Sequence, residues 1–462
     1  MTLGTPDTPL RVAIIGSGPS GFYAADALLN NADGLTVEVD MFDRLLTPHG
    51  LVRGGVAPDH QKIKSVTKVY DKIAAHPRFR FYGNVTFGET LSHADMTEYY
   101  HQIIYAVGAQ TDRALGIAGE ALAGSHTATE FVAWYNGHPD YRHLSFDLSQ
   151  ETAVVVGNGN VAMDVTRILA STHEELAKTD IADYALAALE RSQIKRIIML
   201  GRRGPAQAAF THPELKEFGE LEAANVIVAP ADALLDPFSA QDIQGDRDAA
   251  KNVTLLQQYA AQAPNPAKPR QIIMRFLVSP VELLGSTRLE AVKVVKNMLE
   301  RDSSGALRAR ATDETEVLPA GLIFRSIGYQ GVPLPDVPFD LKRGVIPNVD
   351  GRVIGNDELV TGEYVVGWIK RGPSGIIGTN KPDSIATVKA MLFDAANGQT
   401  ILPATPSRTA LEACLNERAV RYISYADWQQ LDAEEVQRGV AQGRPRIKFT
   451  DPTQMLAFLN KP

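Results

Sequence analysis

Two glycine patterns of the G-x-G-x-x-G/A type constrain this chain more than any other feature. The first is Gly16–Gly21, between the apolar stretch Val12–Ile15 and the helix-like run Phe22–Leu29. The second is Gly157–Ala162, directly after the β-branched stretch Ala153–Val156. In this pattern the first glycine allows a tight turn, the second admits a pyrophosphate close to the backbone, and the third small residue lets helix and strand pack closely. Two copies in strand–turn–helix context predict an α/β protein with two Rossmann-like nucleotide-binding domains.

The residues after the next strand differ between the two copies. The stretch Val37–Phe42 ends at Asp43, whose carboxylate would accept hydrogen bonds from ribose hydroxyls, as in FAD or NAD sites. The stretch Ile197–Leu200 is instead followed by Gly201 and the pair Arg202–Arg203, which would bind a 2′-phosphate. The second site is therefore predicted to take NADP(H). A chain that binds two dinucleotides usually moves a hydride between a nicotinamide and a flavin.

Composition narrows the function further. The 462 residues carry a net charge of −8, which argues against nucleic acid as a partner. No apolar run approaches about 18 residues, and the first residues lack the pattern of a signal peptide, so no membrane span and a cytoplasmic location are expected. The single cysteine, Cys414, excludes electron transfer through a cysteine pair within the chain and an iron–sulfur cluster held by four of its own thiolates.

The order of these features predicts a discontinuous domain. The first part of an FAD-binding domain is expected at 1–110, an inserted NADP-binding domain at 111–324, and the second FAD-binding part with a C-terminal tail at 325–462. The Ala-, Leu- and Glu-rich segment 171–193 is expected to be helical, and a helix is expected to open at Pro58.

Several motifs resemble one family in the same order. They are 50–64 (GLVRGGVAPDHQKIK), 157–164 (GNGNVAMD), 201–203 (GRR), 214–217 (ELKE), 325–329 (RSIGY) and 367–375 (GWIKRGPSG). The chain closely resembles the adrenodoxin-reductase-like ferredoxin–NADP reductases from about residue 11 to 396, and its tail resembles that of the bacterial members. The resemblance implies non-covalently bound FAD, NADPH as electron donor and a small iron–sulfur protein of the ferredoxin type as acceptor.

The resemblance and the fingerprints together give the expected site residues. Trp368 offers apolar surface and an N–H donor to the flavin ring, and Gly375 would let the nicotinamide approach that ring closely. The expected FAD contacts are Gly16, Gly18, Ser20, Gly21, Asp43, Leu51, Phe87, Trp368, Gly375, Ile376 and Ile377. The expected NADP contacts are Arg113, Asn158, Gly159, Asn160, Val161, Arg202, Arg203, Glu214 and Gly375.

No general base is expected, since hydride transfer depends on stacking and orientation. His60 and Glu217 match family positions near the two rings and are expected to tune charge, geometry and hydration; no metal site is expected. Lys195, Arg196, Lys370 and Arg371 are candidates for a basic surface that docks the acceptor. Three other functions are alternatives. The single cysteine argues strongly against an electron-input subunit like that of glutamate synthase, and no substrate-pocket pattern supports a flavin monooxygenase. The third is a non-enzymatic redox scaffold.

Overall fold

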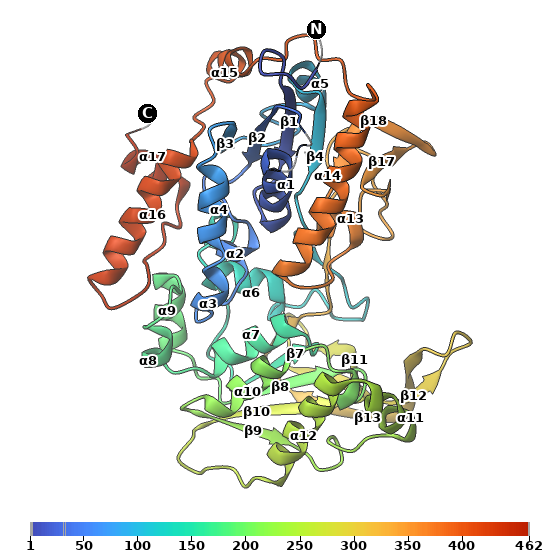
Figure 1. Ribbon diagram of the computed structural model, residues 1–462. Helices are drawn as coiled ribbons and strands as arrows, with labels where there is room; N and C mark the ends of the chain where they lie inside the picture. Colours follow the sequence, from blue (N-terminus) through green and yellow to red (C-terminus); the bar gives the residue numbers. More distant parts are fainter. Residues whose placement is uncertain (1–2, 31, 33, 461–462) are drawn as a thin grey trace. The chain divides into compact units, whose positions relative to one another are not determined.

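The computed structural model describes residues 3–30, 32 and 34–460. These residues form two compact units. Unit 1 takes the described residues of Met1–Val56, His60–Thr111 and Tyr329–Pro462, and unit 2 takes Ala57–Asp59 and Asp112–Gly328. The short strands β5 (Thr111–Asp112) and β15 (Tyr329–Gln330) lie where the chain leaves unit 1 and returns to it. Unit 2 is thus inserted in unit 1, which is assembled from both ends of the chain (Figure 1).

A seven-stranded sheet in the order β16-β17-β18-β4-β1-β2-β3 organises unit 1. Strands β18, β4, β1, β2 and β3 are parallel, so their carboxyl ends share one edge, whereas β16 and β17 add an antiparallel extension. The strand bounds are β1 (Leu10–Ile15), β2 (Val37–Asp43), β3 (Phe79–Gly83), β4 (Gln102–Tyr105), β16 (Asn348–Val349), β17 (Arg352–Gly355) and β18 (Glu358–Val365).

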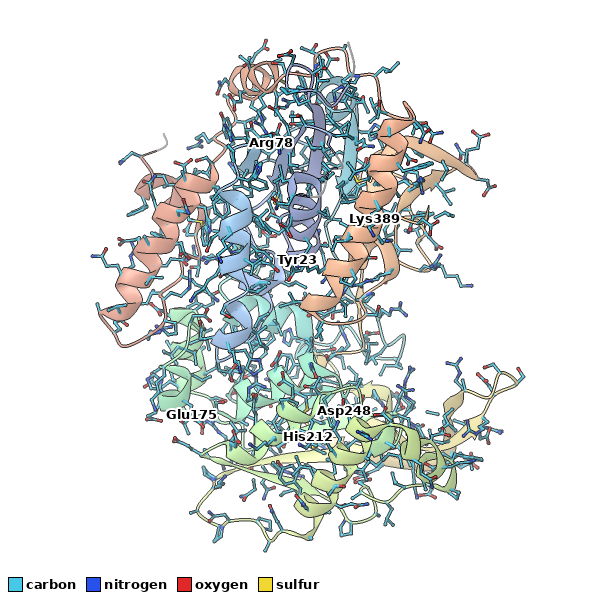
Figure 2. All side chains as sticks on the ribbon, in the orientation of Figure 1. Tyr23, Arg78, Glu175, His212, Asp248 and Lys389 are labelled. Carbon is cyan, nitrogen blue, oxygen red and sulfur yellow. The ribbon has the colours of Figure 1, made fainter. Side chains whose placement is uncertain are left out.

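Helices flank this sheet. They are α1 (Pro19–Asn30), α2 (Leu51–Gly54), α3 (Gln61–Lys64), α4 (Thr67–Ala74), α5 (His93–Tyr99), α13 (Trp368–Arg371), the 3₁₀ turn η4 (Ile377–Thr379), α14 (Asn380–Ala396), α15 (Arg408–Glu417), α16 (Tyr425–Val440) and α17 (Pro452–Phe458). Helices α1 and α14 pack on each other although they lie far apart in the sequence (Figure 1). On the other side of α1, Tyr23 (labelled in Figure 2) meets Tyr70 of α4 edge-on, and the two ring centroids are 5.8 Å apart. Every residue of β1 is buried, as expected for a central parallel strand.

Unit 2 contains an all-parallel six-stranded sheet in the order β6-β14-β7-β8-β10-β9 and an antiparallel sheet β11-β12-β13. The strands are β6 (Ser125–Thr127), β7 (Thr152–Val156), β8 (Arg196–Gly201), β9 (Ala224–Val228), β10 (Arg270–Phe276), β11 (Val278–Leu284), β12 (Ala291–Arg301), β13 (Leu307–Pro319) and β14 (Leu322–Arg325). The helices are α6 (Ala128–Tyr135), η1 (Pro139–Tyr141), α7 (Asn160–Ala170), α8 (His173–Leu176), α9 (Asp183–Glu190), η2 (Pro205–Gln207), α10 (His212–Glu220), α11 (Pro237–Asp242), η3 (Ile243–Gly245) and α12 (Arg247–Ala261).

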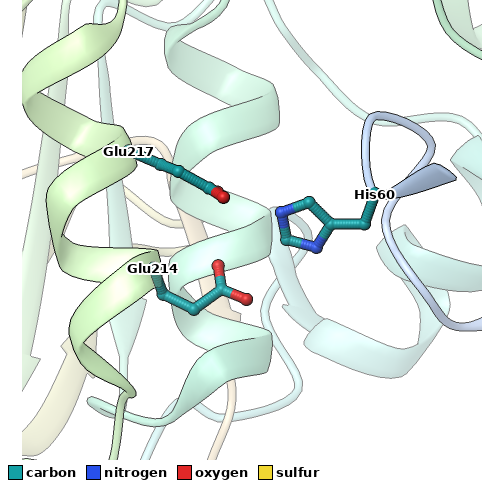
Figure 3. A group of neighbouring side chains, drawn as sticks. All are labelled: His60, Glu214 and Glu217. Carbon is teal, nitrogen blue, oxygen red and sulfur yellow. The ribbon is translucent and has the colours of Figure 1, made fainter. Parts of the chain in front are cut away.

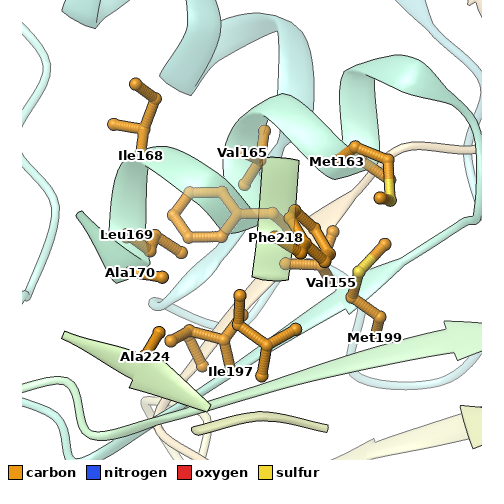
Figure 4. Packing of buried hydrophobic residues seen from close by; sticks show 14 of the residues in the cluster. Val155, Met163, Val165, Ile168, Leu169, Ala170, Ile197, Met199, Phe218 and Ala224 are labelled. Atoms are coloured by element: carbon orange, nitrogen blue, oxygen red, sulfur yellow. The ribbon is translucent and has the colours of Figure 1, made fainter. Parts of the chain in front are cut away.

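The core of unit 2 lies between the parallel sheet and helices α7 and α10. Figure 4 shows Phe218 of α10 among Val165 and Leu169 of α7 and Ile197 of β8, all of them buried. His212 (labelled in Figure 2), at the start of α10, adds a polar link to α12, because its Nδ1 lies 3.1 Å from Asn252 Oδ1. This packing holds the amino end of α10 beside the second fingerprint.

The predicted fold class is confirmed: both units are α/β, with parallel strands and flanking helices, and one is inserted in the other. The expected helix at Pro58 is wrong, because Pro58 and Asp59 form a turn and α3 begins only at Gln61. The Asp59 carboxylate binds Arg167 instead of a helix terminus. The segment 171–193 is helical only in part, with α8 and α9 separated by a buried irregular stretch around Ile181. Among the described residues, no helix is long and apolar enough to cross a membrane.

Candidate functional site

The first fingerprint of unit 1 is a turn between β1 and α1 in which the glycines have different roles. Gly16 has a φ of +106°, and a Cβ there would lie 2.6 Å from the Ala106 carbonyl oxygen. A Cβ on Gly21 would lie 2.4 Å from the carbonyl oxygen of Gly16, so these two positions need glycine for packing. A Cβ on Gly18 would meet no atom within 4 Å. Gly18 therefore presents open backbone, as a pyrophosphate cradle requires.

Asp43, at the end of β2, lies beside this turn. Its Oδ2 accepts a hydrogen bond from the backbone N–H of Ser17 (3.0 Å) and another from the Ser17 hydroxyl, and its Oδ1 accepts from the N–H of Leu45 (2.9 Å). Burial raises the pKa of Asp43, although these hydrogen bonds oppose the rise. Each carboxylate oxygen has further acceptor capacity, so the group can still take a ribose hydroxyl.

Two further segments of unit 1 meet this fingerprint. The first contains Leu51, an exposed residue that opens α2 directly after Gly50. A Cβ on Gly50 would lie 3.0 Å from the Cα of Gly18. The second begins at Gly367, where a Cβ would lie 2.5 Å from the hydroxyl oxygen of Ser20. Residues from three distant parts of the sequence therefore converge on one turn.

The segment after Gly367 carries Trp368 and a glycine-rich turn at 372–375 (GPSG). The indole Nε1 donates to the Ser374 carbonyl (3.2 Å), and the centroids of the Trp368 and Tyr329 rings are 5.5 Å apart. Arg371 donates to the same Ser374 carbonyl (2.9 Å) and to Asn380 Oδ1 (2.9 Å). Gly375 has a φ of +81°, and Ile376 is exposed.

The two remaining FAD candidates from the sequence, Ile377 and Phe87, pack against buried residues of unit 1. Ile377 begins η4 and packs against the buried core of unit 1. Phe87 is buried and meets Tyr105 of β4 edge-on, with centroids 5.8 Å apart. Its expected contact to FAD stays a prediction.

The second fingerprint, in unit 2, has the same glycine geometry as the first. Gly157 has a φ of +128°, and a Cβ there would lie 2.1 Å from the Ser326 carbonyl oxygen. A Cβ on Gly159 would meet nothing within 4 Å. The Asn158 carbonyl accepts from the N–H of Ala209 (3.0 Å), and Asn160 Oδ1 accepts from the N–H of Thr211 (2.9 Å). The fingerprint is thereby joined to the start of α10, while Val161 lies in the first turn of α7.

Arg202 and Arg203 follow β8 at the carboxyl edge of the parallel sheet. Their backbone is fixed: Asn297 Nδ2 donates to the Arg202 carbonyl (2.9 Å) and the N–H of Leu277 donates to the Arg203 carbonyl (3.1 Å). Within the described part of the chain, neither guanidinium forms an ion pair with a carboxylate. Burial lowers the pKa of Arg203, and the positive charges of Arg202 and Arg308 add to this effect. Such uncompensated positive charge suits an anionic ligand.

Helix α10 carries both Glu214 and Glu217, and Figure 3 shows their carboxyl groups on the same side of that helix. Glu214 is buried and Glu217 is partly exposed. His60, also labelled in Figure 3, precedes α3 in unit 1, where its carbonyl accepts from the N–H groups of Ile63 and Lys64. Arg113 is an exposed residue of unit 2 whose N–H donates to the Gly328 carbonyl (3.1 Å).

Arg167 of α7 is a central residue that the sequence analysis missed. Its side chain is only 3% exposed and faces four carboxylates. Nε lies 2.7 Å from Asp59, Nη2 lies 2.6 Å from Asp164, and Nη1 lies 2.9 Å from Glu214 and 3.4 Å from Glu217. Burial alone would lower the pKa of Arg167, but Asp164, Asp59 and Glu214 outweigh it, so the pKa is raised and the guanidinium stays charged. The available signal was an arginine three residues after Asp164, inside a helix whose other residues are mostly apolar.

Two of the four docking candidates make side-chain contacts within unit 1, and among its described residues only Lys370 of these two is paired with a carboxylate. Lys370 Nζ forms an ion pair with Asp383 (2.9 Å) and also lies 3.0 Å from the Thr387 hydroxyl. Arg371 is bound to the glycine-rich turn as described above. Lys195 and Arg196 are exposed in unit 2, but they lie at the amino end of β8, opposite to the edge that carries Arg202.

Comparison with known proteins gives consistent matches over nearly the whole chain. A family model described as pyridine nucleotide-disulphide oxidoreductase matches residues 10–199. NADPH-ferredoxin reductase FprA of Mycobacterium tuberculosis (strain ATCC 25618 / H37Rv) is 46% identical over 456 residues, which are 97% of this chain and 98% of that protein. Human mitochondrial NADPH:adrenodoxin oxidoreductase is 41% identical over 467 residues, covering 98% and 93% of the two chains.

A solved structure supports the same relationship. Mycobacterium tuberculosis FprA in complex with NADPH has 45% sequence identity and a TM-score of 0.92, with 98% of this chain and 100% of that chain covered. Identity of this extent over both units, together with two open glycine turns and the Asp43 and Arg202–Arg203 strand ends, shows that this chain belongs to the NADPH–ferredoxin reductase family that also contains adrenodoxin reductase.

Proposed function

We propose that this chain is an FAD-containing NADPH–ferredoxin oxidoreductase, which transfers a hydride from NADPH to FAD and then single electrons to a ferredoxin-type iron–sulfur protein. The observation that carries the proposal is the contrast between the two fingerprints. One is followed by a carboxylate at Asp43, and the other is followed by two arginines without carboxylate partners among the described residues. That contrast matches a flavin nucleotide with free ribose hydroxyls in unit 1 and a 2′-phosphorylated nicotinamide nucleotide in unit 2.

The residues of unit 1 fit FAD. Gly18 leaves open backbone at the amino end of α1, where N–H groups and the helix dipole favour a pyrophosphate. Asp43 retains acceptor capacity for a ribose, and Leu51, Trp368 and Ile376 offer apolar surface that is partly exposed. In this assignment Ser20, Gly375 and Ile377 complete the flavin contacts.

The residues of unit 2 fit NADP(H). Gly159 leaves the same open backbone before α7, with Asn158, Asn160 and Val161 around it. Arg202 and Arg203 would bind the 2′-phosphate through charge-assisted hydrogen bonds. Glu214 is assigned to the ribose on the nicotinamide side and Arg113 to a further NADP contact, as in the family pattern.

When bound, FAD supplies the step that converts a two-electron donor into a one-electron donor. The chain's own residues bind and orient. Trp368 is fixed through Ser374, and Gly375 provides backbone without a side chain where a nicotinamide would approach. Glu217 and His60 are assigned tuning roles rather than proton transfer, because hydride transfer depends on alignment.

The single cysteine separates this proposal from the description of the matched family model. A disulfide reductase passes electrons through a cysteine pair, and the sequence contains only Cys414. Electrons would therefore leave the flavin for an external acceptor directly. A cytoplasmic location is part of the proposal and can be checked by cell fractionation.

Purification and transient kinetics test the proposal. The protein should be yellow, should release FAD on denaturation, and should be reduced in a stopped-flow experiment much faster by NADPH than by NADH. Reduced protein should then pass electrons to members of a ferredoxin panel. Release of FMN, or a colourless protein that takes up no FAD, would contradict the cofactor assignment; FAD reduction without any ferredoxin turnover would contradict the acceptor.

A further inference from the structure

Helix α16 belongs to the C-terminal tail, yet its buried face meets the segment around Gly50. The buried residues of α16 include Tyr425, Trp428, Leu431 and Glu435, spaced three or four apart along one face. The helix packs against β3 (Figure 1). Two polar side chains from the N-terminal part of unit 1, His49 and Arg53, are joined to this face.

His49 has a backbone conformation that needs support. Its φ is +85°, a region that costs a non-glycine residue on the order of 1–3 kcal/mol. Its N–H donates to the Ser17 carbonyl in the first fingerprint (3.0 Å), and the following Gly50 lies against Gly18. The strained turn is therefore in direct contact with the turn assigned to the FAD pyrophosphate.

The side chain of His49 is held by α16. Its Nε2 lies 3.1 Å from the Tyr425 hydroxyl, which itself donates to Asp71 Oδ1 (2.7 Å). Because the hydroxyl has one proton, His49 Nε2–H is the donor in the first of these bonds. The Trp428 ring stands edge-on to the imidazole, at 5.6 Å and 88°. Burial lowers the pKa of His49 to about 3, and the nearby Arg53 and Arg446 add to this, so the ring is neutral.

Arg53, four residues after His49, is also held by α16. Its guanidinium makes two parallel hydrogen bonds to Glu435, with Nη1–Oε2 at 2.8 Å and Nη2–Oε1 at 2.5 Å. It also lies over the Trp428 ring, 5.1 Å from the centroid. Glu435 is fully buried and has two further partners. Its Oε2 lies 3.2 Å from Nη1 of Arg446, and its Oε1 accepts a hydrogen bond from the N–H of Phe449 (2.8 Å). A buried carboxylate with this many donors fixes the position of Arg53 closely.

We propose that Tyr425 and Glu435 are positioning residues for FAD: through His49 and Arg53 they hold the segment Gly50–Leu51 against the first fingerprint. The proposal rests on FAD binding in unit 1. Neither Tyr425 nor Glu435 is among the residues assigned to contact FAD, so each would act on the cofactor through another side chain. Loss of either link would let the strained turn at His49 relax away from Ser17 and Gly18, and FAD would be held less tightly.

The test compares FAD affinity in Glu435→Gln, Tyr425→Phe and a matched control, Glu434→Gln. Glu434 lies on the same helix but pairs with the partly exposed Arg438 (2.7 Å). FAD dissociation constants would be measured by flavin fluorescence at a temperature where each apo-protein is folded, with visible circular dichroism of the bound flavin as a second readout. We expect FAD to bind about tenfold or more weakly to Glu435→Gln and a few-fold more weakly to Tyr425→Phe. The control should match the parent.

These measurements separate positioning from general stability. A role in folding alone would lower the apo-protein melting temperature while leaving the FAD dissociation constant and the flavin dichroism unchanged, and this result would overturn the proposal. If Glu435→Gln does not fold, Tyr425→Phe decides the matter by the same criterion. If the parent protein binds no FAD, the proposed function itself fails; if the parent binds FAD and both variants bind it equally well, only the positioning role fails.

Discussion

At the scale of single residues, the proposed preference for NADPH over NADH rests on two side chains. Arg202 and Arg203 lie at the carboxyl edge of the parallel sheet without carboxylate partners among the described residues, so their charge is available to a 2′-phosphate. Replacing either by alanine should cost about 1.5–3 kcal/mol of NADPH binding, roughly ten- to a hundredfold in affinity, with little change for NADH. Titration of each nucleotide against the flavin-containing protein measures this.

A matched control is Arg196→Ala, at the exposed amino end of the same strand β8. It should leave both affinities unchanged. An unaltered ratio of NADPH to NADH affinity in the double variant Arg202→Ala/Arg203→Ala would show that the phosphate binds elsewhere.

Arg167 carries the second prediction at this scale. Arg167→Gln would remove a buried cation that lies within 3.4 Å of Asp59, Asp164, Glu214 and Glu217, and so would take away the ion pairs that these carboxylates form with it. We expect a loss of about 3–5 kcal/mol in the free energy of unfolding, measured by urea denaturation. Arg167→Lys should recover little, because an ammonium cannot reproduce the planar fork of hydrogen bonds. Arg275→Gln, whose partners are Asp232 and the exposed Glu316, should lose far less; equal losses would deny Arg167 its central role.

At the scale of elements, the junction of α5 and β18 should respond to pH. His93 Nε2 lies 2.7 Å from Oε1 of the buried Glu363, and this hydrogen bond raises the pKa of His93 although burial opposes it. A raised folded-state pKa means that the stabilisation is complete below the unfolded value of about 6.5 and is lost as pH rises through the folded value. The melting-temperature difference between the parent and His93→Gln should therefore shrink as the solution is made alkaline.

His76→Gln serves as a control of opposite sign. The pKa of His76 is lowered by burial and by Arg78, so any contribution it makes weakens as pH falls instead. A difference between the parent and His93→Gln that stays constant with pH would mean that the His93–Glu363 bond is not charge-assisted in the folded protein.

The elements also show what the sequence could predict. The two strand–turn–helix fingerprints were predictable, because the positive φ of Gly16 and Gly157 and the close contact at Gly21 are local requirements that only glycine meets. The role proposed for α16 was not predictable, because Arg53 and Glu435 are 382 residues apart and neither position has a local sequence pattern that indicates the contact. The helix expected at Pro58 failed for the same reason, since the partner of Asp59 is Arg167, far along the chain.

At the scale of the whole molecule, net charge limits how a ferredoxin can approach. The chain carries −8, and an acidic acceptor would be repelled unless a local cationic surface guides it. In open α/β sheets ligands bind at the carboxyl edge of the parallel strands. Lys195 and Arg196 lie at the amino end of β8, and Lys370 is neutralised by Asp383, so Arg371 is the remaining candidate beside the glycine-rich turn that follows Trp368.

We therefore expect Arg371→Glu to raise the KM for ferredoxin severalfold and to weaken its dependence on salt, whereas Lys195→Glu/Arg196→Glu should leave both nearly unchanged. Because Arg371 also binds Ser374 and Asn380, damage to the turn must be separated from lost docking. Ferricyanide, which needs no docking surface, makes that separation: its reduction should persist in Arg371→Glu if only docking is affected. If instead the Lys195/Arg196 pair controls the ferredoxin KM, or ferricyanide and ferredoxin turnover fall together in Arg371→Glu, the acceptor does not dock through Arg371.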